Sequence, residues 1–176
     1  MKLFFDQDGW SLEGDEAFLN WLDAEFRLEQ EDGDVHIILV DNETIEEMNE
    51  SYLGHEGPTD VISFRLVDEE EEGGGEEFIT PGDEDEAESE EFPFPVGEVY
   101  VSLQMAGIQA RDYDVSLTDE VSRLALHGVL HVAGWLDDSD EQRAAMARRE
   151  DEGLNRARGE GGNLPWNLHG PAAMEG

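Results

Sequence analysis

The chain has 176 residues, enough for one domain with a sizeable core, and its 46 acidic side chains against 10 basic ones give a formal charge of −36. The absence of cysteine excludes disulfides, cysteine-ligated zinc and thiol nucleophiles. No apolar run approaches the roughly 18 residues that a membrane span needs, and the first residues reach an acid at Asp6, unlike a secretory signal. We therefore expect a cytoplasmic protein.

Hydrophobic spacing predicts helices interleaved with strands. In chain order, we expect a helix over 15–28, a strand over 35–40, a short helix over 42–54, strands over 60–67 and 97–103, and helices over 103–113, 118–134 and 139–158. Asn42 and Thr118 are the predicted N-caps of two of these helices. This mixed order predicts an α+β or α/β class.

The predicted elements fall within one domain over residues 1–158. Residues 68–91 are too polar to join its core, so they are expected to form a solvated, dispensable insertion. From Gly159 onward the chain is rich in glycine and contains two prolines, which predicts a loosely ordered tail over 159–176.

The negative charge indicates adaptation to a salt-filled, halophilic cytoplasm. Self-repulsion destabilises a compact chain in dilute buffer, whereas about 1 M salt shortens the screening length to roughly 3 Å. The alternative is an acidic protein with one disordered segment. Residues 68–91 hold 14 acids, yet the rest of the chain keeps 32 acids against 10 basic residues. The acidity is therefore global, which favours the halophilic interpretation.

Two histidines form a candidate metal site. His127 and His131 are four residues apart on the predicted helix, so both imidazoles project from one face, the spacing by which a helix supplies two ligands to zinc. Gly134 can end the helix in a left-handed turn and return Asp137 as a third ligand. This set leaves a fourth position open, as catalytic zinc sites do. Ordinary packing is the alternative, and the glycine and carboxylate make it less favoured.

Gly128 lies between the two histidines, where it costs the helix roughly 0.5–1 kcal/mol relative to alanine. Close approach of a strand or a substrate is the usual reason. Metalloproteases with the H-E-x-x-H pattern place their general base at this position, so a peptidase would need its base elsewhere. His36, His55 and His169 lack comparable neighbours and are expected to be structural or solvated.

The histidine segment resembles the signature H-G-x-L-H-x-x-G-Y-D-H of the YbeY-type endoribonucleases, bacterial metalloproteins of ribosomal RNA maturation. The matching residues are His127, Gly128, Leu130, His131 and Gly134, with Trp135 in place of the tyrosine. Blocks over 48–64 and 97–102 also resemble the family, in the same order. The resemblance implies a zincin-like α+β domain with a small mixed sheet, a divalent metal that is usually taken to be zinc, and hydrolysis of single-stranded RNA.

Two positions depart from the family pattern. The third histidine of the family falls on Asp137, and carboxylate is also a zinc ligand. A basic residue that is common before the P-T-D block, and thought to handle RNA, falls on Leu53. The second change affects the expected handling of RNA more than the first affects the metal site.

The preferred hypothesis is a metal-dependent endoribonuclease of ribosomal RNA processing, with Zn²⁺ or another divalent ion on the two histidines and the aspartate. Its expected partners are ribosomal RNA and the ribosome or its small subunit. Asp60 and Asp138 are candidate general bases, although each can instead be a cap or a partner of a ligand. Thr59 and Trp135 are candidate substrate contacts, with turn formation at Thr59 and burial of Trp135 as alternatives.

Five arginines in the last predicted helix and its exit either form a phosphate-facing patch or pair with nearby acids such as Glu150 and Asp151, which we favour. They are Arg143, Arg148, Arg149, Arg156 and Arg158. The global negative charge argues against an RNA partner, although counterion release contributes little at high salt in any case. The other hypotheses are a metallopeptidase with two His and one Asp ligand, and a ribosome-assembly protein with a structural metal.

Overall fold

A computed structural model describes residues 1–5, 9–66 and 94–171. Its elements are β1 (Lys2–Phe5), β2 (Ser11–Glu13), α1 (Asp15–Leu28), β3 (Val35–Val40), α2 (Asn42–Met48), the π-helical turn η1 (Asn49–Leu53), β4 (Val61–Arg65), β5 (Gly97–Ser102), α3 (Leu103–Asp112), α4 (Leu117–Val132), α5 (Asp140–Arg158), the 3-10 turn η2 (Gly159–Gly161) and β6 (Asn167–His169). The predicted insertion over 68–91 lies outside the described residues.

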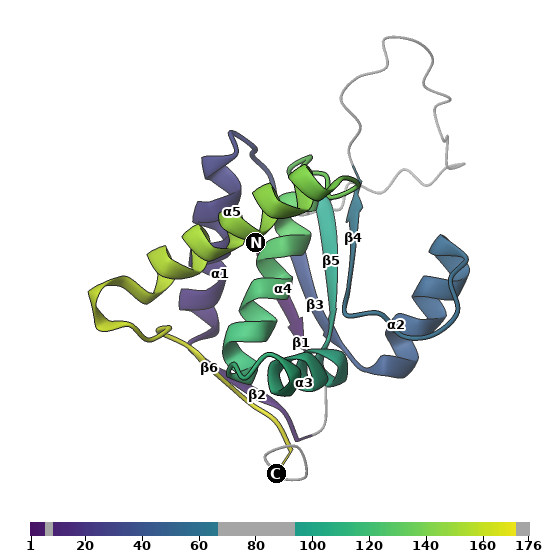
Figure 1. Ribbon diagram of the computed structural model, residues 1–176, viewed down its shortest axis with the longest axis horizontal. Helices are drawn as coiled ribbons and strands as arrows, with labels where there is room; N and C mark the ends of the chain where they lie inside the picture. Colours follow the sequence, from purple (N-terminus) through teal and green to yellow (C-terminus); the bar gives the residue numbers. More distant parts are fainter. Residues whose placement is uncertain (6–8, 67–93, 172–176) are drawn as a thin grey trace, which may run out of the picture.

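The larger sheet of the described residues has the strand order β1-β3-β5-β4 (Figure 1). β1 and β5 each pair in parallel with β3, and β4 pairs antiparallel with β5, with Val61 opposite Val101. Valine and isoleucine dominate β3, as expected for a strand buried on both faces. The mixed sheet packed with helices confirms the predicted α+β class.

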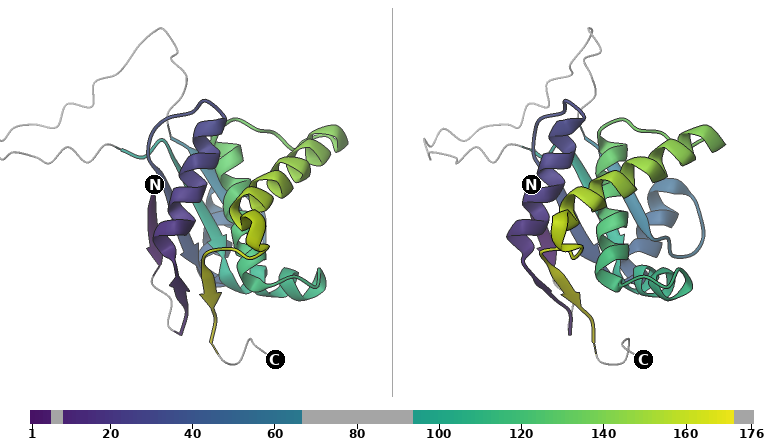
Figure 2. Two further views of the ribbon diagram at one scale, coloured as in Figure 1. Left: turned by 90° about the vertical axis from the view of Figure 1, so that its left-hand side faces the viewer. Right: turned by 60° about the vertical axis from the view of Figure 1, so that its left-hand side comes forward.

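Helices cover both faces of this sheet. Val99 and Val101 of β5 face the main core, where α1 and α4 pack, whereas α2 packs through Ile45 against Ile62 on the opposite face. α5 lies across α1 and α4 (Figure 2). A Cβ built on Gly128 would lie 2.3 Å from Val99 Cγ1, so the glycine allows α4 to approach β5. The expected close approach of a strand at this glycine is confirmed.

The helix caps differ from the predicted ones by one or two residues. Asp41, rather than Asn42, caps α2 by accepting a hydrogen bond from the Thr44 N–H at 2.8 Å. Ser116 caps α4, and Thr118 lies inside the first turn, where its hydroxyl donates to Asn167 at 2.9 Å. Both predictions were wrong because an equally good acceptor stood slightly earlier in the chain.

The expected loose tail differs from the structure over much of its described length. β6 pairs antiparallel with β2, and Trp166, which is 5% exposed, stacks on Trp21 with ring centroids 5.1 Å apart. The Trp166 indole N–H donates to Ser122 Oγ at 2.9 Å, and Leu168 is also buried. The glycine-rich composition was outweighed by two large apolar side chains that reach the core.

Among the described helices, none combines the length and the apolar character that a membrane crossing requires.

Candidate metal centre

The two histidines of α4 face each other across one helical turn. Their rings are nearly perpendicular, with centroids 4.5 Å apart, and His127 Nε2 lies 3.0 Å from His131 Nε2. Both side chains are partly buried, at 20% and 24% exposure. The helix thus presents two ring nitrogens to one point that solvent can reach.

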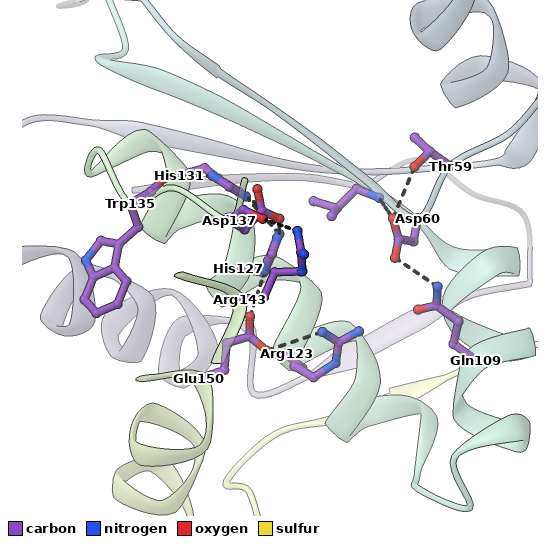
Figure 3. A network of polar contacts seen from close by, with 11 residues as sticks. Thr59, Asp60, Gln109, Arg123, His127, His131, Trp135, Asp137, Arg143 and Glu150 are labelled. Carbon is purple, nitrogen blue, oxygen red and sulfur yellow. Dashed lines mark hydrogen bonds and ion pairs between the residues drawn. The ribbon is translucent and has the colours of Figure 1, made fainter. Parts of the chain in front are cut away.

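Asp137 is brought to this point by the turn that follows α4. Gly134 adopts a φ of +92°, and its N–H donates to the carbonyl of His131 at 2.9 Å, as the predicted left-handed turn requires. Asp137 Oδ2 lies 3.7 Å from His131 Nε2 and 3.9 Å from His127 Nε2. Arg143 donates to the backbone carbonyl of Asp137 at 2.9 Å and so fixes the loop (Figure 3).

Hydrogen bonds on the far side of each ring determine which nitrogen is free. His131 Nδ1 lies 2.9 Å from the carbonyl oxygen of Trp135, which can only accept, so Nδ1 carries the proton. His127 Nδ1 lies 2.7 Å from a carboxylate oxygen of Glu150, and the same reasoning applies. In neutral rings, both Nε2 atoms would then carry lone pairs that face each other and Asp137, an arrangement that a cation between them would stabilise.

The separations fit a metal ion. Zinc lies about 2.0–2.2 Å from its nitrogen and oxygen ligands, so tetrahedral ligand atoms are roughly 3.3 Å apart. The observed separations of 3.0, 3.7 and 3.9 Å lie around that value, and the three ligand atoms lie within 4.8 Å of one another. His127, His131 and Asp137 could therefore hold a metal ion. Asp137 is 40% exposed, which leaves this side of the centre open to solvent.

The other predicted site residues lie outside this group. Asp60 accepts hydrogen bonds from the Val61 N–H at 2.8 Å, the Thr59 hydroxyl at 3.2 Å and the Gln109 amide at 2.9 Å, so it caps the start of β4. Asp138 is exposed. Figure 3 shows the Trp135 ring pointing away from the two imidazoles, and its N–H donates to Glu29, the C-cap residue of α1, at 2.9 Å.

Sequence reasoning missed Glu150, which contacts His127, and Arg123, which contacts Glu150. Glu150 comes from α5, 23 positions after His127, and no local pattern links the two. Arg123 contacts Glu150 at 3.3 Å and stands one helical turn before His127 on α4. That i−4 spacing is the signal that could have found Arg123.

Most arginines of α5 form ion pairs with acidic side chains. Their acidic partners belong mainly to other helices: Arg149 contacts Glu25 and Glu29, Arg156 contacts Glu25, Arg158 contacts Asp119, and Arg143 contacts Asp140. Arg148 is exposed and forms no ion pair with any residue that the structure describes. The favoured alternative of pairing with acids is confirmed for these four arginines, although Glu150 pairs instead with Arg123 and His127.

Fold and site together define a small α+β domain with a His-His-Asp group on a helix and the turn after it. The family model for endoribonuclease YbeY matches residues 11–158. The endoribonuclease YbeY of Brevibacillus brevis is 41% identical over 133 residues, which is 76% of this chain and 80% of that protein. That of Pelotomaculum thermopropionicum is 38% identical over 126 residues, which is 72% of this chain and 73% of that protein. The chain belongs to the endoribonuclease YbeY family.

A solved structure shows the same fold. The solution structure of a protein from Thermotoga maritima aligns with a TM-score of 0.53 and covers 89% of this chain and 90% of its own. The two sequences are 23% identical in this alignment, so the likeness concerns the fold alone.

Proposed function

We propose that this protein is a metal-dependent endoribonuclease that cleaves single-stranded RNA during ribosomal RNA processing in a halophilic cytoplasm. His127, His131 and Asp137 would hold the ion, with zinc favoured by two imidazoles and one carboxylate. The observation that carries the proposal is the approach of the two Nε2 atoms to 3.0 Å of each other beside a carboxylate, with each Nδ1 engaged on the far side of its ring. Membership of the endoribonuclease YbeY family supports RNA as the substrate.

A divalent ion at this point would stabilise charge on a phosphate oxygen and acidify a water molecule. The chain's own residues hold that position: the Nδ1–H groups are engaged behind the rings, and Arg143 fixes the loop that carries Asp137. Asp138 is the favoured proton acceptor, because it adjoins a ligand and is exposed. Asp60 is less suited, since three hydrogen-bond donors already occupy its carboxylate.

Substrate binding would rely little on charge. Most arginines of α5 are paired with acids, and Leu53 supplies no cation, so among the described residues of that helix Arg148 is the exposed arginine without an ion pair. Stacking of RNA on Trp135 is disfavoured because the indole is directed to Glu29, and the Thr59 hydroxyl already donates to Asp60. Molar salt would weaken phosphate contacts in any case, which fits a protein with this charge.

A metallopeptidase is the disfavoured alternative. The position after the first histidine, where such enzymes carry their glutamate, has no room for a side chain, because a Cβ on Gly128 would meet Val99. A ribosome-assembly protein with a structural metal is a second alternative, and the solvent-facing carboxylate of Asp137 argues against a closed structural site.

The test is cleavage of a single-stranded RNA in molar potassium chloride by metal-free and metal-loaded protein, with casein as a parallel substrate. We expect RNA cleavage only by metal-loaded protein, with the His131→Ala variant inactive and the exposed His55→Ala variant as active as the parent. Cleavage of casein alone would support the peptidase, and no cleavage by a fully metal-loaded parent would support the assembly protein.

A further inference from the structure

Glu150 is an acid from a distant helix that reaches the back of the metal site. It is 5% exposed, and its Oε1 lies 2.7 Å from His127 Nδ1. Its Oε2 lies 3.3 Å from the guanidinium of Arg123 (Figure 3). The same guanidinium also donates hydrogen bonds to Glu120. A buried carboxylate is costly unless it is paired and hydrogen-bonded. Arg123 and His127 are the partners that stabilise Glu150, so the carboxylate links the arginine to the imidazole.

We infer that Arg123 and Glu150 form a positioning pair that selects the Nδ1–H tautomer of His127 and thereby sets the metal affinity of the site. This inference rests on the proposed metal site. Neither residue is a proposed ligand: the pair acts through the imidazole.

The reason is the chemistry of imidazole. A neutral ring carries one proton, on either Nδ1 or Nε2, and only the Nδ1–H form offers a lone pair on Nε2 to an ion. An ionised carboxylate only accepts hydrogen bonds, so Glu150 stabilises the Nδ1–H form and repels the other tautomer. Without Glu150, His127 could place its proton on Nε2 and donate it to the bare Nε2 of His131, 3.0 Å away. That internal hydrogen bond would close the site to a cation.

Arg123 holds the Glu150 carboxylate in place. Burial opposes the charge of the arginine, but hydrogen bonds to Glu120 and charge attraction from Glu120 and Glu150 raise the pKa of Arg123 above its usual value. The guanidinium therefore remains a cation beside the Glu150 carboxylate. Arg149, next to Glu150 in the chain, contacts Glu25 at 2.7 Å and ties this part of α5 to α1.

His131 provides an internal reference. Its Nδ1–H is fixed by the backbone carbonyl of Trp135, which no side-chain substitution can remove. A change at Glu150 should therefore alter the tautomer of His127 and leave that of His131 unchanged. General unfolding or loosening of α4 would affect both rings.

The first experiment reads the tautomers in metal-free protein by nitrogen NMR of the imidazoles, at about pH 8.5, where imidazole is ordinarily neutral. We expect the Nδ1–H form for both histidines in the parent. In Glu150→Ala we expect His127 to shift toward the Nε2–H form while His131 is unchanged. An Nε2–H form of His127 in the parent would overturn the inference even if no variant folds. This measurement needs no bound metal, so its result can contradict the inference without contradicting the proposed function.

The second experiment measures zinc affinity by competition with a chromophoric chelator. Outer contacts of this kind are worth about 10–100-fold in metal affinity, so Glu150→Ala should weaken zinc binding by that factor. Glu150→Gln retains an oxygen that accepts a hydrogen bond from the Nδ1–H, so its zinc affinity should be higher than that of Glu150→Ala. Arg123→Gln should also weaken zinc binding, although residue 123 does not contact the imidazole. Asp151→Ala, an exposed neighbour on the same helix, is the matched control and should bind zinc like the parent. Parent-like affinity in folded Glu150→Ala would refute the inference.

Discussion

Substitution of Gly128 by alanine tests the close approach of α4 to β5. The new Cβ would lie 2.3 Å from Val99 Cγ1, more than about 1 Å short of an ordinary carbon–carbon contact. Val99 is fully buried and β-branched, so it cannot rotate away. Overpacking of this kind costs about 1–3 kcal/mol, against which alanine regains up to about 1 kcal/mol of helix propensity. After subtraction of about 1 kcal/mol of helix propensity, we expect a net loss of about 0–2 kcal/mol in the free energy of unfolding.

The assay is a double-mutant cycle by denaturant unfolding in molar salt. Val99→Ala removes both methyl groups that meet the new Cβ and is destabilising by itself, because it leaves a cavity. When it is combined with Gly128→Ala, the two effects should not add: we expect a favourable coupling of about 0.5–3 kcal/mol. A stabilised Gly128→Ala protein, or strict additivity of the two changes, would show that this glycine does not serve the helix–strand contact.

Three further predictions concern stability. Trp166→Ala should lower the free energy of unfolding by about 3–5 kcal/mol, since the indole stacks on Trp21 in the core. His169 is half-exposed, so His169→Ala should change the free energy of unfolding by less than about 0.5 kcal/mol. Denaturant unfolding measures both effects. The melting temperature should rise steeply between about 0.1 M and about 1 M potassium chloride as self-repulsion is screened, and an indifferent melting curve would refute halophilic adaptation. Burial opposes the charge of Glu25, but Arg156 and Arg149 hold the pKa of that carboxyl below its usual value, so its contribution is present at neutral pH and is lost as pH falls below about 4. Glu25→Gln should therefore be less stable at neutral pH and should show a flatter acid limb, and parallel stability–pH curves for parent and variant would contradict this.

The closeness of His127, His131 and Asp137 could be predicted because the three residues are near one another in the sequence. Two histidines at helical spacing, a glycine at the helix end and a carboxylate three residues later specify a local geometry, which needs no knowledge of the rest of the fold. The same holds for the strand over 35–40 and the helix over 103–113, whose patterns are regular. The residues within each of these segments were sufficient to predict its structure.

Features that depend on distant contacts could not be predicted in this way. Glu150 faces His127 only because α5 crosses α4, and Trp166 is buried only because it packs against Trp21 and Phe18 of α1, far away in the chain. β1 and β2 are short strands without a clear alternation, and each depends on a partner strand far along the chain. Asp60 is a different case: its hydrogen bonds with the Val61 N–H and the Gln109 amide fit the alternative role of a cap at the start of β4, and its role as a base stays a prediction.

The most direct test of the proposed centre is the metal content of the purified chain, measured by elemental analysis in the parent and in His131→Ala. We expect one divalent ion per parent chain, and a large loss in the variant, because removal of one Nε2 leaves two ligands at a solvent-exposed point. His55→Ala, which removes an exposed histidine outside the group, should retain the parent's metal. Equal metal content in the parent and in His131→Ala would contradict the assignment of the centre to His127, His131 and Asp137.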